Sequence, residues 1–316
     1  MKLHSLITQY VTYRQSLGEK FITNGNVLKS FNRFLGRSKN LSDIKSKQVN
    51  SFLAGKGAIT INWHKKHQAL RGFYRYALSR GYVKSSPLPT IIPQKPQRLT
   101  PYIYNAKELK DLLDAALIYQ GTRGKLVPYM VRTILLLLYG AGLRIGEVIN
   151  LSLADVDLTQ SLLIIRETKF FKTRLVPIGT QLTQSLFLYV LWRKREGFSQ
   201  DPQSPFFVRR DGKAIHYHNI DLAFRLIRKK AGVKRTDHPR YHPRLHDLRH
   251  AFAVHRLTTW YKEGADVQEL LPVLSVYLGH SKLEDTSVYL TMTPALLDEA
   301  GHRFQTYAFS KENSHD

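Results

Sequence analysis

Side chains that could act on a phosphate group gather in the C-terminal third of the chain. In HPRLHDLRHAF (242–252), His246, Arg249 and His250 follow one another at i, i+3 and i+4, which places them on one face of a helix. In LGHSKLEDTSVYL (278–290), His280 precedes Tyr289 by nine residues. Arginine and histidine bind anionic oxygens, and a tyrosine hydroxyl is a nucleophile. The two stretches therefore indicate chemistry on an anionic substrate.

A metal site is the alternative interpretation of the two histidines of the first stretch. His246 and His250 have the i, i+4 spacing of zinc-binding helices, but the glutamate of an HExxH motif is missing. Arg249 lies between them and would repel a divalent cation. The chain also has no cysteine, so a cysteine-based metal site is excluded. The pattern favours a site without a metal ion.

Two further stretches add cations. GAGLRIGEVINL (140–151) places Arg144 at the start of a helix after a glycine-containing turn, and Glu147 could hold it by an i, i+3 pair. TKFFKTR (168–174) forms a turn between two expected strands and carries Lys169, Lys172 and Arg174. Taken singly, these stretches are also compatible with a surface arginine and a solvated hairpin.

Together, two arginines, a lysine, two histidines and a tyrosine could cleave a phosphodiester without a divalent ion. The cations would stabilise the charge that builds on the phosphoryl oxygens. The tyrosine would attack phosphorus and form a covalent intermediate. Ionising a free tyrosine at pH 7 costs about 4 kcal/mol, so a histidine base or a strong positive potential must assist it. A lysine is a suitable acid for the leaving sugar oxygen.

The charge of the chain points to a polyanionic partner. The 316 residues carry a formal net charge of +24. Residues 1–100 hold 18 lysines and arginines against two acidic residues, Glu19 and Asp43. Nucleic acid is the usual partner of such a protein, and no basic amphipathic helix beside a lipidation signal indicates a membrane. The absence of cysteine and of a signal-peptide pattern leads us to expect a cytoplasmic protein.

Helical periodicity and proline density predict two domains. Residues 1–86 form several amphipathic helices, residues 87–103 form a proline-rich linker, and residues 104–316 form a mixed domain. Strands are expected at 162–167 and 173–178, a buried helix at 127–140, and a helix at 284–290. The long helix expected at 61–81 carries cations that we predict to contact DNA phosphates: Lys65, Lys66, Arg71 and Arg75.

These motifs, taken as a set, resemble the tyrosine recombinase (phage integrase) family over nearly the whole chain. The family's G-x-R-x-x-E box is matched by residues 142–147, and its hairpin lysine before K-x-R-x-V-P is matched by Lys169 before residues 172–177. The H-x-L-R-H box is matched by residues 246–250. The L-G-H box and the tyrosine nine residues later are matched by residues 278–280 and Tyr289.

The resemblance implies a fold and a set of roles. The fold would be mainly α with a small β-sheet (α+β) in the catalytic domain, preceded by an all-α, SAM-like core-binding domain, and the two would clamp duplex DNA. The implied roles divide the site between phosphate binding, proton transfer and attack: Arg144, Arg249 and His280 would hold the scissile phosphate, His246 would accept a proton or orient the phosphate, Lys169 would be the acid, Tyr289 the nucleophile, Glu147 would support Arg144, and Lys172 and Arg174 would contact DNA. Because Phe170 and Phe171 replace glycines that the family often has around the lysine, Lys172 remains the alternative acid.

The resemblance also implies the reaction and the partners. Attack would leave a 3′-phosphotyrosine and a free 5′-hydroxyl, and neither a metal, ATP nor another cofactor would be needed. Four protomers would assemble on two sites of double-stranded DNA, with accessory recombinase or directionality proteins as further partners. The segment 293–309 would dock on a neighbouring subunit or on its own domain. The host would be bacterial and the protein associated with the nucleoid.

The biological role is left open between several kinds of protein. Simple two-domain members of the family include Xer-type dimer resolvases, integron integrases and transposases of small mobile elements. The altered lysine hairpin favours a mobile-element recombinase. A type IB topoisomerase shares this chemistry but relaxes DNA, and a DNA-binding protein that kept the fold without catalysis is a third alternative.

Overall fold

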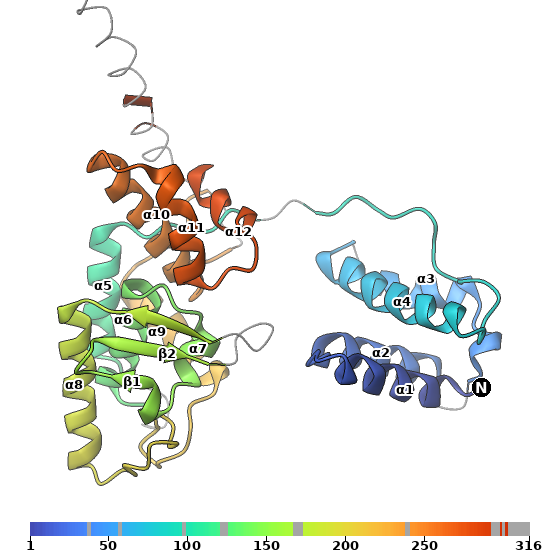
Figure 1. The fold of residues 1–316 in the computed structure, drawn as a ribbon, viewed down its shortest axis with the longest axis horizontal. Coiled ribbons are helices and arrows are strands. Elements are labelled where there is room, and N and C mark those ends of the chain that lie inside the picture. The colour runs from blue at the N-terminus through green and yellow to red at the C-terminus, as the bar shows by residue number, and fades with distance from the viewer. Residues whose placement is uncertain are drawn as a thin grey trace, which may run out of the picture. The chain divides into compact units, whose positions relative to one another are not determined.

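The computed structural model describes residues 1–36, 39–55, 59–96, 99–120, 126–166, 173–237, 241–291, 298 and 301–302. The chain divides into two compact units, Met1–Leu99 and Thr100–Asp316 (Figure 1). The linker expected at 87–103 spans this division. Both units are mainly helical, and the second carries a small sheet, which confirms the fold class expected from the sequence.

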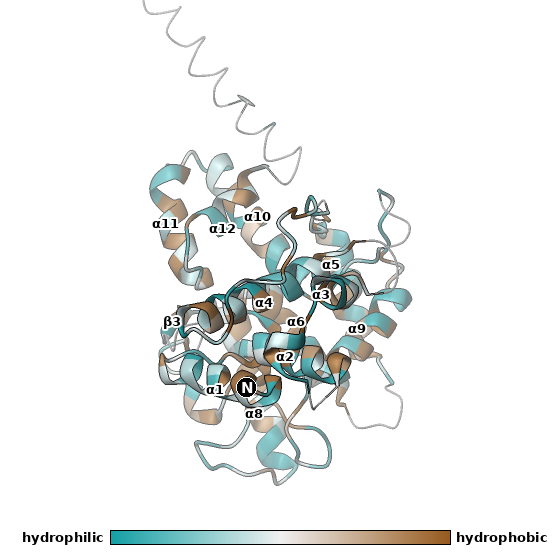
Figure 2. Ribbon diagram, turned by 90° about the vertical axis from the view of Figure 1, so that its right-hand side faces the viewer, coloured by the Kyte–Doolittle hydropathy of each residue, from teal (hydrophilic) through white to brown (hydrophobic). Residues whose placement is uncertain are grey.

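The first unit is helical throughout its described part. Its helices are α1 (Leu3–Ser16), α2 (Ile22–Leu35), the short 3₁₀ turn η1 (Leu41–Asp43), α3 (Ser46–Ala54) and α4 (Ile61–Ser79). Apolar residues spaced at helical period bury one face of each helix in a shared core, with Leu28, Phe31, Leu70 and Phe73 fully buried. Figure 2 shows hydrophobic and hydrophilic residues following one another along these helices.

Helix α4 separates its side chains between the core and the solvent. Trp63, Leu70, Phe73, Tyr74 and Ala77 are buried, as their spacing predicts. The four cations that we predicted to contact DNA lie outside this buried face of the helix. Lys65, Arg71 and Arg75 are exposed, and Lys66 is half-buried. This arrangement keeps most of the charge in water while the aromatic residues stabilise the unit.

The second unit contains the remaining elements. They are α5 (Ala106–Leu117), α6 (Pro128–Gly140), α7 (Ile145–Ile149), η3 (Leu153–Asp155), β1 (Val156–Asp157), β2 (Leu162–Ile165), β3 (Arg174–Pro177), α8 (Thr180–Arg195), α9 (Tyr217–Lys230), α10 (Asp247–Lys262), α11 (Val267–Leu278), α12 (Glu284–Ser287) and η5 (Val288–Thr291). None of the helices in the described ranges is long and apolar enough to cross a membrane.

The sheet of the second unit is small and antiparallel. Its strand order is β1-β2-β3, and Leu163 pairs with Val176 while Ile165 pairs with Arg174. Leu163, Ile165 and Val176 are buried in the same core as the apolar face of α6. Because side chains alternate along a strand, Leu175 lies on the opposite face and is exposed. The sheet therefore holds the start of β3, where Arg174 lies, against the core.

A second, smaller core joins the C-terminal elements. Phe252, Val254 and Leu257 of α10, Leu274 and Leu278 of α11 and Tyr289 of η5 are buried together. The helix expected at 284–290 is instead a four-residue helix, α12, followed by the 3₁₀ turn η5 that carries Tyr289. This packing places Tyr289 against α10.

Candidate active site

Arg144 opens the site at the N-terminus of α7. Its backbone is extended, and its amide donates a hydrogen bond of 2.9 Å to Glu147 Oε2. The side chain donates from Nη1 to Glu147 Oε1 at 2.7 Å and from Nη2 to the carbonyl of Gly279 at 3.0 Å. The i, i+3 pair expected from the sequence is therefore present. Arg144 keeps 36% of its side chain exposed, so its guanidinium can meet a ligand from solvent.

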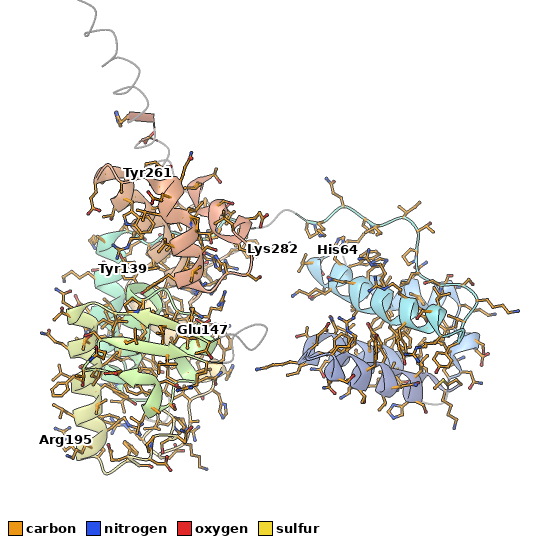
Figure 3. The ribbon with its side chains drawn as sticks, viewed as in Figure 1. His64, Tyr139, Glu147, Arg195, Tyr261 and Lys282 are labelled. Atoms are coloured by element: carbon orange, nitrogen blue, oxygen red, sulfur yellow. The ribbon has the colours of Figure 1, made fainter. Side chains whose placement is uncertain are left out.

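Glu147 binds a second arginine from the sheet. Arg174 of β3 donates from Nη1 to Oε1 at 3.0 Å and from Nη2 to Oε2 at 2.9 Å, and its Nε donates to the carbonyl of Tyr277 (Figure 3, which labels Glu147). Burial alone would raise the pKa of Glu147, but the hydrogen bonds and charges of Arg174 and Arg144 lower it to about 2. Glu147 is thus an anion that fixes two guanidinium groups.

Arg174 forms an ion pair that the sequence did not indicate. Its side chain is only 10% exposed, and both of its terminal nitrogens are engaged by Glu147. This bidentate geometry gives a strong and directional ion pair. Contact of Arg174 with DNA stays a prediction, whereas its contact with Glu147 is part of the described structure.

Arg249 lies at the centre of the site and is 1% exposed. Its Nη1 donates to the carbonyl of Gly142 at 2.6 Å, and its Nη2 donates to the carbonyl of Leu278 at 2.7 Å and contacts His280 Nε2 at 3.0 Å. Burial, followed by the charge of Arg144, lowers the pKa of Arg249 to about 10. The guanidinium therefore remains charged at neutral pH in a fixed orientation.

Two glycines allow these close approaches. Gly142 has φ +58°, and a Cβ there would lie 2.4 Å from a ring carbon of Phe252. Gly279 has φ +66°, and a Cβ there would lie 2.7 Å from Arg174 Nη1. Both positions need a left-handed backbone and an empty side-chain volume, which glycine supplies. Steric constraints therefore explain why the G-x-R and L-G-H boxes have glycine at these two positions.

His280 is held at both ring nitrogens. Because arginine only donates, Nε2 accepts from Arg249, and Nδ1 then carries the hydrogen and donates to Thr286 Oγ1 at 2.6 Å. Burial, followed by the charge of Arg249, lowers the pKa of His280 to about 4. Thr286 is fully buried in α12, so the segment between His280 and Tyr289 also orients the histidine.

Tyr289 is 2% exposed, and its hydroxyl meets a histidine of α10. The distance from the hydroxyl to His250 Nδ1 is 3.0 Å, and the two ring centroids lie 5.6 Å apart. The ring of His280 stacks on the other side at 6.2 Å. Burial raises the pKa of Tyr289, while the charge of Arg249 opposes this effect.

His246 lies at the solvent edge of the site. It precedes α10, and its ring meets that of His250 edge-on at 4.7 Å. The residue is exposed, yet crowding by neighbouring side chains, followed by the charge of Arg249, lowers its pKa to about 4. His246 is therefore exposed to solvent at the edge of the site, and Arg144 is half-buried.

The structure brings together most, but not all, of the residues that the sequence singled out. Arg144, Glu147, Arg249, His280 and Tyr289 are joined by the contacts above. Lys169 and Lys172 lie outside the described residues. Lys65, Lys66, Arg71 and Arg75 belong to the first unit. Lys66 donates to the carbonyl of Phe52 at 2.7 Å and covers its ring, so its ammonium already has protein partners.

Two residues of the site received no role from the sequence. His250 was visible in the H-x-L-R-H box, but its partner Tyr289 lies 39 residues further along the chain. Thr286 lies six residues after His280, with a polar spacing that does not distinguish it from the other residues of that turn. Within the described part of the chain, no group of three histidine, cysteine or acidic side chains is arranged to hold a metal ion.

Comparison with known sequences places this geometry in a family. Residues 104–295 match the model of the phage integrase family. An integrase/recombinase of Sinorhizobium fredii is 34% identical over 95% of this chain and 96% of its own length. The tyrosine recombinase XerC of Chlamydia caviae is 31% identical over 71% of this chain and 65% of its own. The similarity to the S. fredii relative therefore extends over 95% of the chain.

Solved structures show the same fold. The integrase of transposon Tn1549 in complex with transposon right-end DNA superposes with a TM-score of 0.68, covering 98% of this chain and 100% of that chain at 16% identity. A lambda integrase tetramer bound to a Holliday junction superposes with a TM-score of 0.65, covering 92% of this chain and 77% of that chain at 17% identity. At these identities the likeness concerns the fold alone.

Proposed function

The chain belongs to the phage integrase family, whose members are tyrosine recombinases, and on that premise we propose how its own residues break and rejoin DNA. Tyr289 attacks a phosphodiester that Arg144 and Arg249 hold, with His280 orienting Arg249. The observation that carries this proposal is that these four side chains, from four separate segments, are brought together. Arg144 bonds the carbonyl of Gly279 beside His280, Arg249 contacts His280, and the ring of His280 stacks on that of the buried Tyr289.

The cations supply the stabilisation that a metal ion gives in other enzymes. Charge accumulates on the phosphoryl oxygens in the transition state, and donors that are already oriented bind it without further reorganisation. Arg249 is oriented by two carbonyls, and Arg144 by Glu147 and by the carbonyl of Gly279. Glu147 compensates part of the positive charge of the site before DNA binds. Arg174 in turn holds Glu147, and we assign it this positioning role, with the DNA contact kept as a prediction.

The strand transfer conserves the energy of the phosphodiester bond. Tyr289 Oη bonds to phosphorus as the bond to the 5′-oxygen breaks, leaving a 3′-phosphotyrosine and a 5′-hydroxyl. A 5′-hydroxyl of a partner strand then attacks phosphorus and releases Tyr289, so neither ATP nor a metal takes part. We assign the proton donor for the leaving oxygen to Lys169, with Lys172 as the alternative. His246 orients the phosphate from the solvent edge.

Double-stranded DNA and further copies of the chain are the partners that this chemistry needs. The exposed cations Lys65, Arg71 and Arg75 of α4 supply phosphate contacts in the first unit. Exchange between two duplexes needs four active sites, so we propose a tetramer on two DNA sites, with accessory proteins setting direction. The bacterial relatives support a bacterial protein acting at the nucleoid.

We propose integration, excision or transposition of a mobile element as the biological role. The integrase/recombinase of S. fredii matches almost the whole chain at 34% identity, whereas a XerC of Pediococcus pentosaceus that matches a similar share does so at 27%. Dimer resolution of the Xer type is the second candidate, because further XerC sequences lie near 30% identity.

Covalent trapping tests the proposed chemistry. The purified protein is mixed in EDTA with nicked DNA fragments from around its own gene, and denaturing gels reveal a protein–DNA adduct. We expect an adduct from the natural protein and from Tyr139→Phe, whose hydroxyl bonds His255 away from the site, but none from Tyr289→Phe. An adduct that persists in Tyr289→Phe, or DNA binding without an adduct on any fragment, would contradict the proposal. Relaxation of supercoiled DNA without sequence preference would favour a topoisomerase.

A further inference from the structure

The hydroxyl of Tyr289 has one close ring-nitrogen partner in the described structure, and that partner is His250. The 3.0 Å separation between Tyr289 Oη and His250 Nδ1 is a hydrogen-bond distance. Tyr289 is packed in the core that joins α10, α11 and η5, and His250 is half-buried on α10 beside it. No hydrogen bond in the described ranges links His246 to Tyr289. The family resemblance gave the proton-accepting role to His246, but the geometry places a different histidine at the reacting oxygen.

We propose that His250 is a catalytic residue that accepts the proton of Tyr289 at Nδ1. The step rests on the proposed recombinase function. As Tyr289 Oη bonds to phosphorus, the phenolic hydrogen moves to His250 Nδ1, and the bond to the 5′-oxygen breaks with protonation of that oxygen by the acid. In the reverse step, His250 returns the proton to Tyr289 as the phosphotyrosine bond breaks. His246 is then free to act on the phosphate alone.

The electrostatic surroundings of His250 fit this role. Burial, followed by repulsion from His246, lowers the pKa of His250 to about 3, so at neutral pH its ring is neutral and Nδ1 can accept the hydrogen bond of Tyr289. The same surroundings disfavour the protonated ring before substrate binds. The charged and titratable groups that act on it are His246 and Arg249 of the same helical segment, Arg244 before it and His280 after α11. A bound phosphate adds a negative charge beside these cations. It therefore raises the pKa of His250 and strengthens the base when substrate is present.

The same helix carries a matched control. His255, five residues after His250 on α10, contacts the hydroxyl of Tyr139 through Nδ1, also at 3.0 Å, and burial lowers its pKa. This second histidine–tyrosine pair has the same chemistry, and no hydrogen bond within the described ranges links it to Arg144, Arg249, His280 or Tyr289. A His255→Gln variant thus reports the effect of breaking such a pair in α10 without touching the reaction.

The experiment measures single-turnover adduct formation on nicked DNA for the natural protein, His250→Gln and His255→Gln. Glutamine keeps a hydrogen-bonding group but cannot take up the proton. At pH 7 we expect about a 10²- to 10³-fold slower adduct formation in His250→Gln and an unchanged rate in His255→Gln. The loss in His250→Gln should shrink about tenfold for each unit of rising pH, because ionised tyrosine needs no base.

A second substrate separates nucleophile activation from leaving-group protonation. DNA with sulfur in place of the bridging 5′-oxygen releases a thiolate, which needs no proton. We expect this DNA to restore the rate of adduct formation in Lys169→Ala but not in His250→Gln. A rate in His250→Gln within threefold of the natural protein, or restoration by the sulfur substrate, would overturn the proposal. A loss that stays constant with pH would also overturn it, because that result indicates positioning of Tyr289. A natural protein that forms no adduct would instead count against the recombinase function itself.

Discussion

The two units place their cations in different environments, exposed to solvent in the first unit and buried in the second. On α4 of the first unit, Lys65, Arg71 and Arg75 extend into solvent and make no hydrogen bond or ion pair with any described residue. In the second unit, Arg249 is buried and bonded to two carbonyls, and Arg174 is held by both oxygens of Glu147. Both sets are positively charged, but only the second is fixed in orientation.

The difference separates attraction from catalysis. Exposed cations release counterions on meeting DNA and add affinity without a precise geometry. A transition state is stabilised only by groups that are already oriented when its charge develops. We therefore expect changes in the buried set to reduce rates, and changes on α4 to reduce affinity.

The largest expected effect comes from Arg249. Arg249→Lys keeps the charge but removes the planar group that reaches the Gly142 and Leu278 carbonyls and the phosphate together. We expect adduct formation at saturating DNA to slow about 10²- to 10³-fold, with DNA affinity changed only a few-fold. Single-turnover rates and titrations measure both quantities. Arg256→Lys, an exposed position of the same helix, is the control, and an equal loss there would refute the distinction.

The ionisation of Glu147 makes the free energy of unfolding depend on pH. Its pKa is about 2 in the folded protein against 4.5 for a free side chain, so its ion pairs stabilise the fold above pH 4.5. That contribution, about 3 kcal/mol, is lost as the pH falls through 4.5 towards 2. We expect Glu147→Gln to lower the free energy of unfolding by about this amount at pH 7, and by less at pH 3.5. Urea unfolding at several pH values measures the difference.

The exposed Glu269 provides the control for this pH series. Glu269→Gln should change the free energy of unfolding little at any pH, because surface carboxylates contribute little to stability. If the effect of Glu147→Gln were the same at pH 7 and pH 3.5, its contribution would be packing rather than ionisation.

Gly279 tests whether the close approach of Arg174 matters. Gly279→Ala places a methyl group 2.7 Å from Arg174 Nη1 and imposes a side chain on a left-handed backbone. The strain costs about 1–2 kcal/mol, so we expect roughly tenfold slower adduct formation and a lower melting temperature. Gly146→Ala is the matched control, since nothing lies within 4 Å of its Cβ and its φ is not positive. Equal rates of adduct formation and equal melting temperatures in the two variants would show that the contact with Arg174 does not require glycine at position 279.

The smallest effects are expected on α4, where neighbouring lysines differ. Lys65 is exposed, whereas Lys66 donates to the carbonyl of Phe52. Lys65→Ala should weaken DNA binding a few-fold and reduce the slope of log affinity against log salt by about 1. Lys66→Ala should mainly lower the free energy of unfolding, by about 1 kcal/mol. Binding titrations at several salt concentrations decide this, and equal slopes for the two variants would show that both lysines meet phosphate.

Much of the local structure follows from sequence periodicity. The helix expected at 127–140 is α6 (Pro128–Gly140), and the strands expected at 162–167 and 173–178 contain β2 and β3. The segment 284–290 was expected to be one helix but is α12 followed by η5. Helical periodicity does not distinguish an α-helix from a short helix that tightens into a 3₁₀ turn, because both place apolar residues three to four positions apart.

The sequence by itself determined the family, the two-part organisation of charge, and the identities of the arginines, histidines and tyrosine of the site. Those features depend on residue types and short spacings, which a linear chain displays directly. Only the tertiary structure decided which groups meet: Glu147 with Arg174, Thr286 with His280, and His250 with Tyr289. Glu147 and Arg174 lie 27 residues apart in the sequence, and His250 and Tyr289 lie 39 residues apart. Thr286 and His280 are only six residues apart. Their contact depends on how helices and strands pack, because local periodicity specifies which face a residue occupies but not what lies opposite it.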